Sequence, residues 1–228
     1  MRLLMLAALV AVVAAVAAAA YAAWSQQLQL HSRVSTTELD AEFTSVLVLD
    51  ACSNNDDYNV KVDNNGLPDF NYIYTIGANY SCMEAKMLDT DGDGDYDTIE
   101  VTIYNAYPRY YSDLQANIVN NGNLPENLLR LVIESADGSV KYGTIYESNA
   151  TLISNGHGYL VDLNGDGVAD IALDWQDSIG SLLDVGNRLR FTFGVAVLDG
   201  APEGATLQFR LRLEMVQWNA YNPPSSGG

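Results

Sequence analysis

Hydrophobic and polar positions alternate in short blocks along most of the chain, and clusters of Asn, Asp, Gly and Pro separate the blocks. A period of two is typical of β-strands, because successive side chains point to opposite faces of a sheet. The pattern predicts about ten strands. They are Ala41–Leu49, Phe70–Ile76, Thr98–Tyr104, Tyr111–Asn120, Leu128–Glu134, Val140–Tyr146, Gly158–Asp162, Val168–Leu173, Arg190–Leu198 and Ala205–Trp218.

Strands at this spacing predict an all-β fold, a jelly-roll-like β-sandwich. The segment Ser178–Val185 is expected to form at most one or two helical turns. No Pro, Gly or Ser linker divides the chain of 228 residues, so residues 39–221 are expected to form one domain. The tail 222–228, NPPSSGG, is expected to be disordered.

Residues 1–23 contain one basic residue, Arg2, followed by an uncharged apolar run rich in alanine. Ala-x-Ala patterns at its end predict a secretory signal peptide. The run Leu3–Ala23 is also long enough to span a bilayer, so a retained anchor is the alternative. Either interpretation places the rest of the chain outside the cell.

Residues 24–38 contain a short alternating segment. Leu28, Leu30 and Val34 share one strand face, and polar residues occupy the other. The segment is either the first strand of the domain's own sheet or a strand that completes the sheet of a neighbouring subunit.

Charge narrows the possible partners. The chain has 11 Lys and Arg against 29 Asp and Glu, a formal net charge of −18. Nucleic acid and anionic lipid both require basic surfaces, so this balance argues against them and favours cations.

The stretch LDTDGDGDYDTIE places five aspartates within nine positions. It matches D-x-[DN]-x-[DN]-G-x5-E, the loop in which alternate side chains turn toward a Ca²⁺ ion and glycine permits the bend. The candidate ligands are Asp89, Asp91, Asp93, Asp95 (through its backbone carbonyl), Asp97 and Glu100. The flanks are β rather than helical, so the pattern predicts a calcium loop on a sheet. The alternative is a solvated turn.

A second stretch, DLNGDGVAD, matches the same pattern less completely. Asp162, Asn164, Asp166 and Asp170 occupy positions 1, 3, 5 and 9. Position 12 is Leu173, so the last carboxylate would come from Asp174 or from elsewhere. Calcium is again expected, because Mg²⁺ favours waters and phosphates over protein cages.

Cys52 and Cys82 are the only cysteines, and an even count in an exported chain predicts a disulfide. Two buried free thiols are the alternative. Asn79 and Asn149 begin N-x-S/T sequons, which mark potential glycosylation sites.

Three stretches carry a resemblance to a known family. Residues 20–43, AYAAWSQQLQLHSRVSTTELDAEF, resemble the N-terminal signature of the camelysin/TasA family of secreted filament subunits. Residues 97–128 are similar to its strand–Asn-Ala-Tyr-Pro–strand segment, and residues 210–221 resemble the closing strand of its archaeal members.

The family includes archaeal bundling pili and tube-forming cannulae, whose subunits join by donor-strand complementation. The resemblance therefore implies that Gln26–Thr37 is a donor strand and that the partners are identical subunits. The acidic loops resemble those of calcium-dependent cannula subunits. The segment between Cys52 and Cys82 matches no motif of the family.

Catalysis is not expected, because His31 and His157 are the only histidines and no hydrolase motif occurs. The leading hypothesis is a secreted structural subunit of a pilus or tube, in contact with identical subunits and with neighbouring filaments or cells. The alternative is a calcium-dependent adhesin or carbohydrate-binding module, whose sugar-stacking faces would come from tyrosines and from Trp24, Trp175 and Trp218.

Overall fold

Thirteen strands in two antiparallel sheets make up most of the computed structural model, which describes residues 39–53, 57–64, 66–77, 79–145, 158–175 and 179–220. The first sheet has the order β3 (Pro68–Thr75), β2 (Tyr58–Val62), β6 (Tyr110–Asn120), β12 (Arg188–Val197), β10 (Ile171–Trp175) and β9 (Tyr159–Val161). In addition, β1 (Ala41–Val48) pairs with β6. The second sheet has the order β11 (Leu182–Leu183), β7 (Glu126–Glu134), β13 (Ala205–Gln217), β5 (Thr98–Ala106) and β4 (Cys82–Leu88), with β8 (Lys141–Ile145) also on β7.

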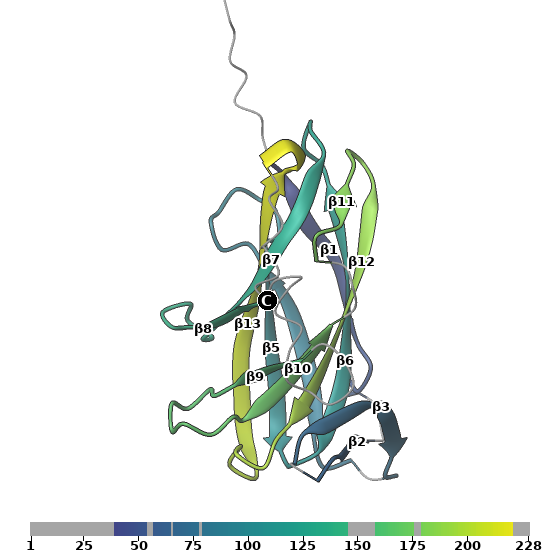
Figure 1. Ribbon diagram of the computed structural model, residues 1–228, viewed down its shortest axis with the longest axis vertical. Helices are drawn as coiled ribbons and strands as arrows, with labels where there is room; N and C mark the ends of the chain where they lie inside the picture. Colours follow the sequence, from purple (N-terminus) through teal and green to yellow (C-terminus); the bar gives the residue numbers. More distant parts are fainter. Residues whose placement is uncertain are drawn as a thin grey trace, which may run out of the picture. The chain divides into compact units, whose positions relative to one another are not determined.

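The sheets pack face to face as a β-sandwich (Figure 1), so the predicted all-β, jelly-roll-like fold is confirmed. The chain crosses repeatedly between the layers, for example from β5 to β6 and from β6 to β7. Each of the ten predicted strands is present within a few residues of its expected bounds. All described strands belong to one compact unit.

The alternating pattern explains the core. On β6, Leu114, Ala116 and Ile118 point inward and are fully buried. On the paired strand β12, Phe193 lies opposite Leu114 and Phe191 opposite Ala116. These side chains meet the inward faces of β5 and β13 in one cluster, whose burial supplies most of the driving force for folding.

The sequence pattern missed β2, β4 and β11. Charged side chains on the outer face of β4, Glu84 and Lys86, obscure its apolar residues. The predicted helical turns in Ser178–Val185 are wrong for residues 179–185. Leu182 and Leu183 instead pair with the start of β7 as a two-residue strand, because a neighbouring sheet edge supplies their hydrogen bonds.

The outer face of the second sheet carries a ladder of ion pairs centred on β13. Arg210 contacts Glu100 of β5 at 3.0 Å, and Arg212 contacts Glu134 of β7 at 2.8 Å. Arg212 also lies 3.3 Å from Glu214, which accepts a hydrogen bond from Arg130. The ladder joins three adjacent strands through cross-strand pairs.

The Asn-Ala-Tyr-Pro stretch forms the corner at which the chain passes from β5 to β6. Asn105 and Arg109 have positive φ angles of 51° and 73°, an uncommon backbone for residues other than glycine. The hydroxyl of Tyr107 lies 3.1 Å from the buried carboxylate of Asp57, and that carboxylate accepts the N–H of Ser81 at 3.0 Å. The segment between the cysteines thus anchors this corner.

Several predicted segments lie outside the described residues. They are the signal peptide 1–23, the donor-strand region 24–38 with Leu28, Leu30 and Val34, and the tail 222–228. Among the residues that the structure does describe, no helix is long and apolar enough to cross a membrane.

Candidate functional site

The first acidic loop connects β4 to β5 and is ordered by its own carboxylates. Asp89 accepts the backbone N–H of Gly92 through Oδ1 (2.7 Å) and that of Gly94 through Oδ2 (3.1 Å). Asp97 accepts the N–H of Thr90 at 3.1 Å. Gly92 and Gly94 have φ angles of 84° and 106°, so glycine is needed at both bends.

These bonds bring three exposed aspartates together. Asp89, Asp91 and Asp93 each have a carboxylate oxygen within 4.8 Å of the others. Carboxylates this close repel one another unless a cation compensates their charge. Three convergent oxygens are a fitting start for a Ca²⁺ site, which takes six to eight in total.

Glu100, the expected last ligand, lies on β5 and is not one of the three clustered carboxylates. Its Oε2 accepts hydrogen bonds from Nε and Nη2 of Arg210, at 3.2 and 3.0 Å. The loop motif assumes a helix after the loop, which would turn position 12 back toward the ion. Here a strand follows, and the cross-strand partner Arg210 holds the side chain on the outer face of the sheet.

The second acidic loop, between β9 and β10, repeats the same bonding. Asp162 accepts the N–H of Gly165 at 2.6 Å and that of Gly167 at 2.8 Å. Asp170 accepts the N–H of Leu163 at 2.7 Å and that of Asn164 at 3.1 Å. In both loops, therefore, the carboxylate at position 1 accepts the backbone N–H groups of positions 4 and 6, and the carboxylate at position 9 accepts that of position 2.

The carboxylates of the second loop differ in exposure. The backbone N–H of Gly167, together with those of Gly165, Asp166 and Asn164, lowers the pKa of half-buried Asp162. Asp170 is fully buried, which raises its pKa, and its bonds brace the loop. Asp174 lies on β10 opposite Gly194, within a strand rather than in the loop, so the residues brought together are Asp162, Asn164, Asp166 and Asp170.

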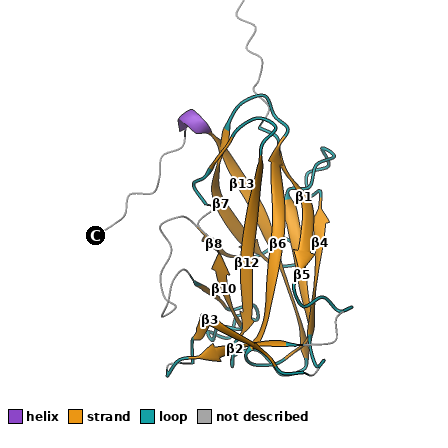
Figure 2. Cartoon of the chain, turned by 90° about the vertical axis from the view of Figure 1, so that its right-hand side faces the viewer, coloured by secondary structure: helices purple, strands orange, loops and turns teal. Residues whose placement is uncertain are grey.

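A groove separates the open edges of the two sheets. Among the described residues, β1 pairs only with β6 and β4 only with β5, apart from a bridge between Ala51 and Met83. The two edges lie side by side (Figure 2). The groove between them has a volume of about 480 Å³. Unpaired edges of this kind are ready to accept a further strand.

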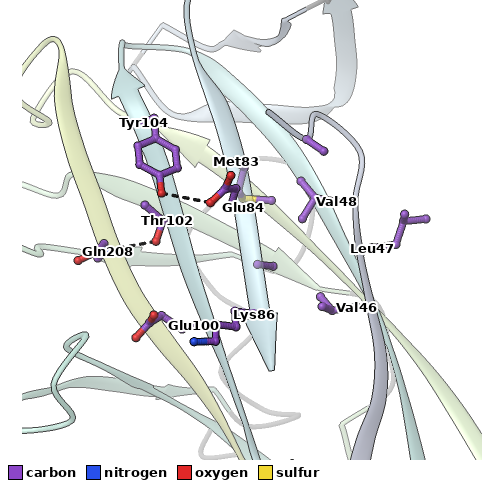
Figure 3. Close-up of a pocket in the computed structure, with 12 residues that line it drawn as sticks. Val46, Leu47, Val48, Met83, Glu84, Lys86, Glu100, Thr102, Tyr104 and Gln208 are labelled. Atoms are coloured by element: carbon purple, nitrogen blue, oxygen red, sulfur yellow. Dashed lines mark hydrogen bonds between the residues drawn. The ribbon is translucent and has the colours of Figure 1, made fainter. Parts of the chain in front are cut away.

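The groove has an apolar and a polar wall (Figure 3). Val46 and Val48 of β1 point into the groove from one side, whereas Leu47 between them is 66% exposed and points away from β4. On the other side lie Met83 and Ala85, and beyond them a set of polar side chains from β4, β5 and β13. This set consists of Glu84, Lys86, Glu100, Thr102, Tyr104 and Gln208.

The predicted disulfide is confirmed, and it joins the two edges at one end of the groove. Cys52 follows β1 and Cys82 begins β4, with their Cα atoms 4.8 Å apart. The backbone N–H of Met83 also donates to the carbonyl of Asp50 at 3.0 Å. The covalent link thus holds β1 beside β4 although no ladder joins them.

Replacing Cys52 and Cys82 by serine is expected to lower the free energy of unfolding by roughly 3 kcal/mol. Without the disulfide the unfolded chain is no longer closed into a loop, so it gains conformational entropy. The sequence separation of this loop is 30 residues. Urea unfolding of the wild type and the double variant measures the effect. A wild-type midpoint that is the same with and without reductant would contradict it.

The two sequons differ in what the structure describes. Asn79 is exposed in the turn before β4, where a glycan has access to solvent. Asn149 lies outside the described residues, as do His31 and His157. The expectation that the chain is not an enzyme therefore stays a prediction.

Comparison with known proteins identifies no relative: no family model, curated protein or solved structure matches the chain. The resemblance of residues 20–43, 97–128 and 210–221 to the camelysin/TasA family stays a prediction.

Proposed function

We propose that this protein is a structural subunit of an extracellular filament or tube. Subunits polymerise when the segment Gln26–Thr37 of one copy enters the groove between β1 and β4 of another, and bound calcium stabilises the assembly. The partners are identical subunits, and neighbouring filaments or cells provide further contacts. The observation that carries the proposal is that, among the described residues, two unpaired sheet edges flank a groove with one apolar wall.

The chemistry of the groove suits the segment. A strand placed between the edges would find backbone donors and acceptors on β1 and β4, which gives β-augmentation its affinity. The apolar face of the segment, Leu28, Leu30 and Val34, would meet apolar side chains such as Val46 and Val48. The disulfide supports this arrangement, because it keeps the edges together and is typical of exported proteins.

Calcium enters the proposal through the two acidic loops. The same pattern of hydrogen bonds from backbone N–H groups to an aspartate fixes the shape of each loop, and carboxylate oxygens lie on the surface of the loop. A divalent ion offsets their mutual repulsion, and an ion that binds only the folded state stabilises that state by mass action.

A change in the groove wall tests the proposal. Val46→Asp is expected to prevent polymerisation without unfolding the domain, because Val46 lines the groove and is only half-buried. Leu182→Asp is the matched control, since Leu182 is 54% exposed on β11 and lines no part of the groove. Electron microscopy and sedimentation measure assembly. Normal filaments from Val46→Asp would count against the groove as acceptor.

The aromatic surface of β3 favours a second candidate function, a calcium-dependent adhesin or carbohydrate-binding module. Tyr72 and Tyr74 alternate along this strand and are 60% and 45% exposed. Exposed aromatic faces can stack on sugar rings. Two results together would select this function. The protein would stay monomeric with Ca²⁺, and it would bind to a glycan array in a way that the double variant Tyr72→Ala, Tyr74→Ala abolishes.

A further inference from the structure

A buried carboxylate lies beneath the first acidic loop. Glu126 begins β7, where its backbone is held between Leu183 of β11 and Gln217 of β13. Its side chain is fully buried. Oε1 accepts the backbone N–H of Asp40 at 2.9 Å, whereas the buried Oε2 has no hydrogen-bond partner among the described residues.

An arrangement of this kind is costly for an isolated protein. Removing a carboxylate from water without a compensating partner disfavours its charged form. Burial accordingly raises the pKa of Glu126, although the N–H of Asp40 opposes the shift. A cation placed beside Oε2 would offset this cost.

Glu126 shares a cavity with the acidic loop. The cavity has a volume of about 190 Å³. Its carboxylate-bearing residues are Asp40, Asp91, Asp93, Asp95, Asp97 and Glu126. Among the described residues that line it, none is basic, so no side chain there balances the negative charge. A water molecule takes about 30 Å³ in the liquid, so a cation and several waters fit.

We propose that Glu126 is a ligand of a divalent cation held in this cavity, where it closes the first acidic loop in place of Glu100. The loop supplies oxygens from one side, and Glu126 supplies its unpartnered oxygen from the sandwich. All of these are hard oxygen ligands of the type that Ca²⁺ takes in flexible geometry. This inference rests on the calcium part of the proposed function.

The site lies beside the start of β1, at the first described residues of the domain. Asp40 donates its N–H to the same carboxylate, and Ala41 begins β1. Phe43 of β1 in turn donates its N–H to the carbonyl of Tyr96 in the loop, at 2.7 Å. Cation binding therefore links the start of β1 to both the loop and β7.

Calorimetric titration of the purified protein with Ca²⁺ tests the inference. Glu126→Gln keeps the shape of the side chain and an acceptor for Asp40 but removes the charge. We expect it to weaken Ca²⁺ binding at the first loop at least tenfold, the order of loss found when a metal site loses a supporting group. Glu100→Gln is the matched control and is expected to bind as the wild type does, because Glu100 pairs with Arg210.

Thermal unfolding provides the second measurement. In chelator, Glu126→Gln is expected to melt no lower than the wild type, since it lacks the buried unpaired charge. In Ca²⁺ the wild type is expected to melt higher than the variant. If the variant does not fold, Asp93→Asn replaces it, because the Asp93 carboxylate belongs to the clustered trio and Asp93 lines the cavity. Weaker binding is again expected.

The outcomes separate this inference from the broader proposal. Wild-type affinity in Glu126→Gln overturns the role of the cavity and leaves calcium binding by the loops intact. Where Asp93→Asn is used instead, wild-type affinity likewise overturns the role of the cavity. Loss of binding in Glu100→Gln but not in Glu126→Gln restores the ligand expected from the motif. A wild type that takes up no Ca²⁺ overturns both.

Discussion

Protein that lacks residues 26–37 is expected to fold and to form no filaments. All thirteen described strands and the disulfide lie beyond the deleted segment, so no described strand pairing uses its residues. What the deletion removes is the alternating face of Leu28, Leu30 and Val34. Circular dichroism checks the fold, and electron microscopy checks assembly. Filaments of normal appearance from the truncated protein would refute strand donation by this segment.

A synthetic peptide of residues 26–37 supplies the control for this experiment. It is expected to bind the truncated protein, because it restores the missing strand by β-augmentation. A peptide in which Leu28, Leu30 and Val34 are replaced by aspartate keeps the length but not the apolar face, and is expected not to bind. Fluorescence anisotropy with labelled peptides measures both affinities.

Chelation is expected to lower the melting temperature of the wild type, and Asp93→Ala with Asp166→Ala to abolish most of that response. Asp93 belongs to the exposed trio of the first loop, and Asp166 to the bonded turn of the second. Free Ca²⁺ at about 100 times Kd stabilises the folded state by roughly 2.7 kcal/mol per site. Differential scanning calorimetry in Ca²⁺ and in chelator measures the shift.

The control for this variant carries the same change of charge outside the loops. Asp184→Ala with Asp199→Ala removes two exposed carboxylates, one after β11 and one after β12. Its response to chelation is expected to equal that of the wild type. If isothermal calorimetry detects no Ca²⁺ uptake by the wild type, the two acidic stretches are solvated turns.

Local patterns were sufficient to predict most of the architecture. The alternation of hydrophobic and polar residues predicted ten strands, because successive side chains of a strand point to opposite faces and only one face is buried. Cysteine count predicted the disulfide, and the loop motif located both acidic turns. In those turns the bonds run between residues at most seven positions apart, so short stretches of sequence contain all the partners.

Contacts between distant residues decided the rest. Strand β4 was missed because its outer face is charged, and β11 because it exists only where the edge of β7 accepts it. The motif assigned Glu100 to the calcium loop, but Arg210, 110 positions away, holds it on the outer face of the sheet.

Glu126 carries no sequence signal at all, because its partner Asp40 is 86 positions away and the cavity depends on how the loop, β1 and β7 meet. The groove has the same origin, since an unpaired edge is defined by the strands that do not lie beside it. Periodicity determines which elements form, whereas pairing between distant strands determines which edges stay open and which carboxylates meet.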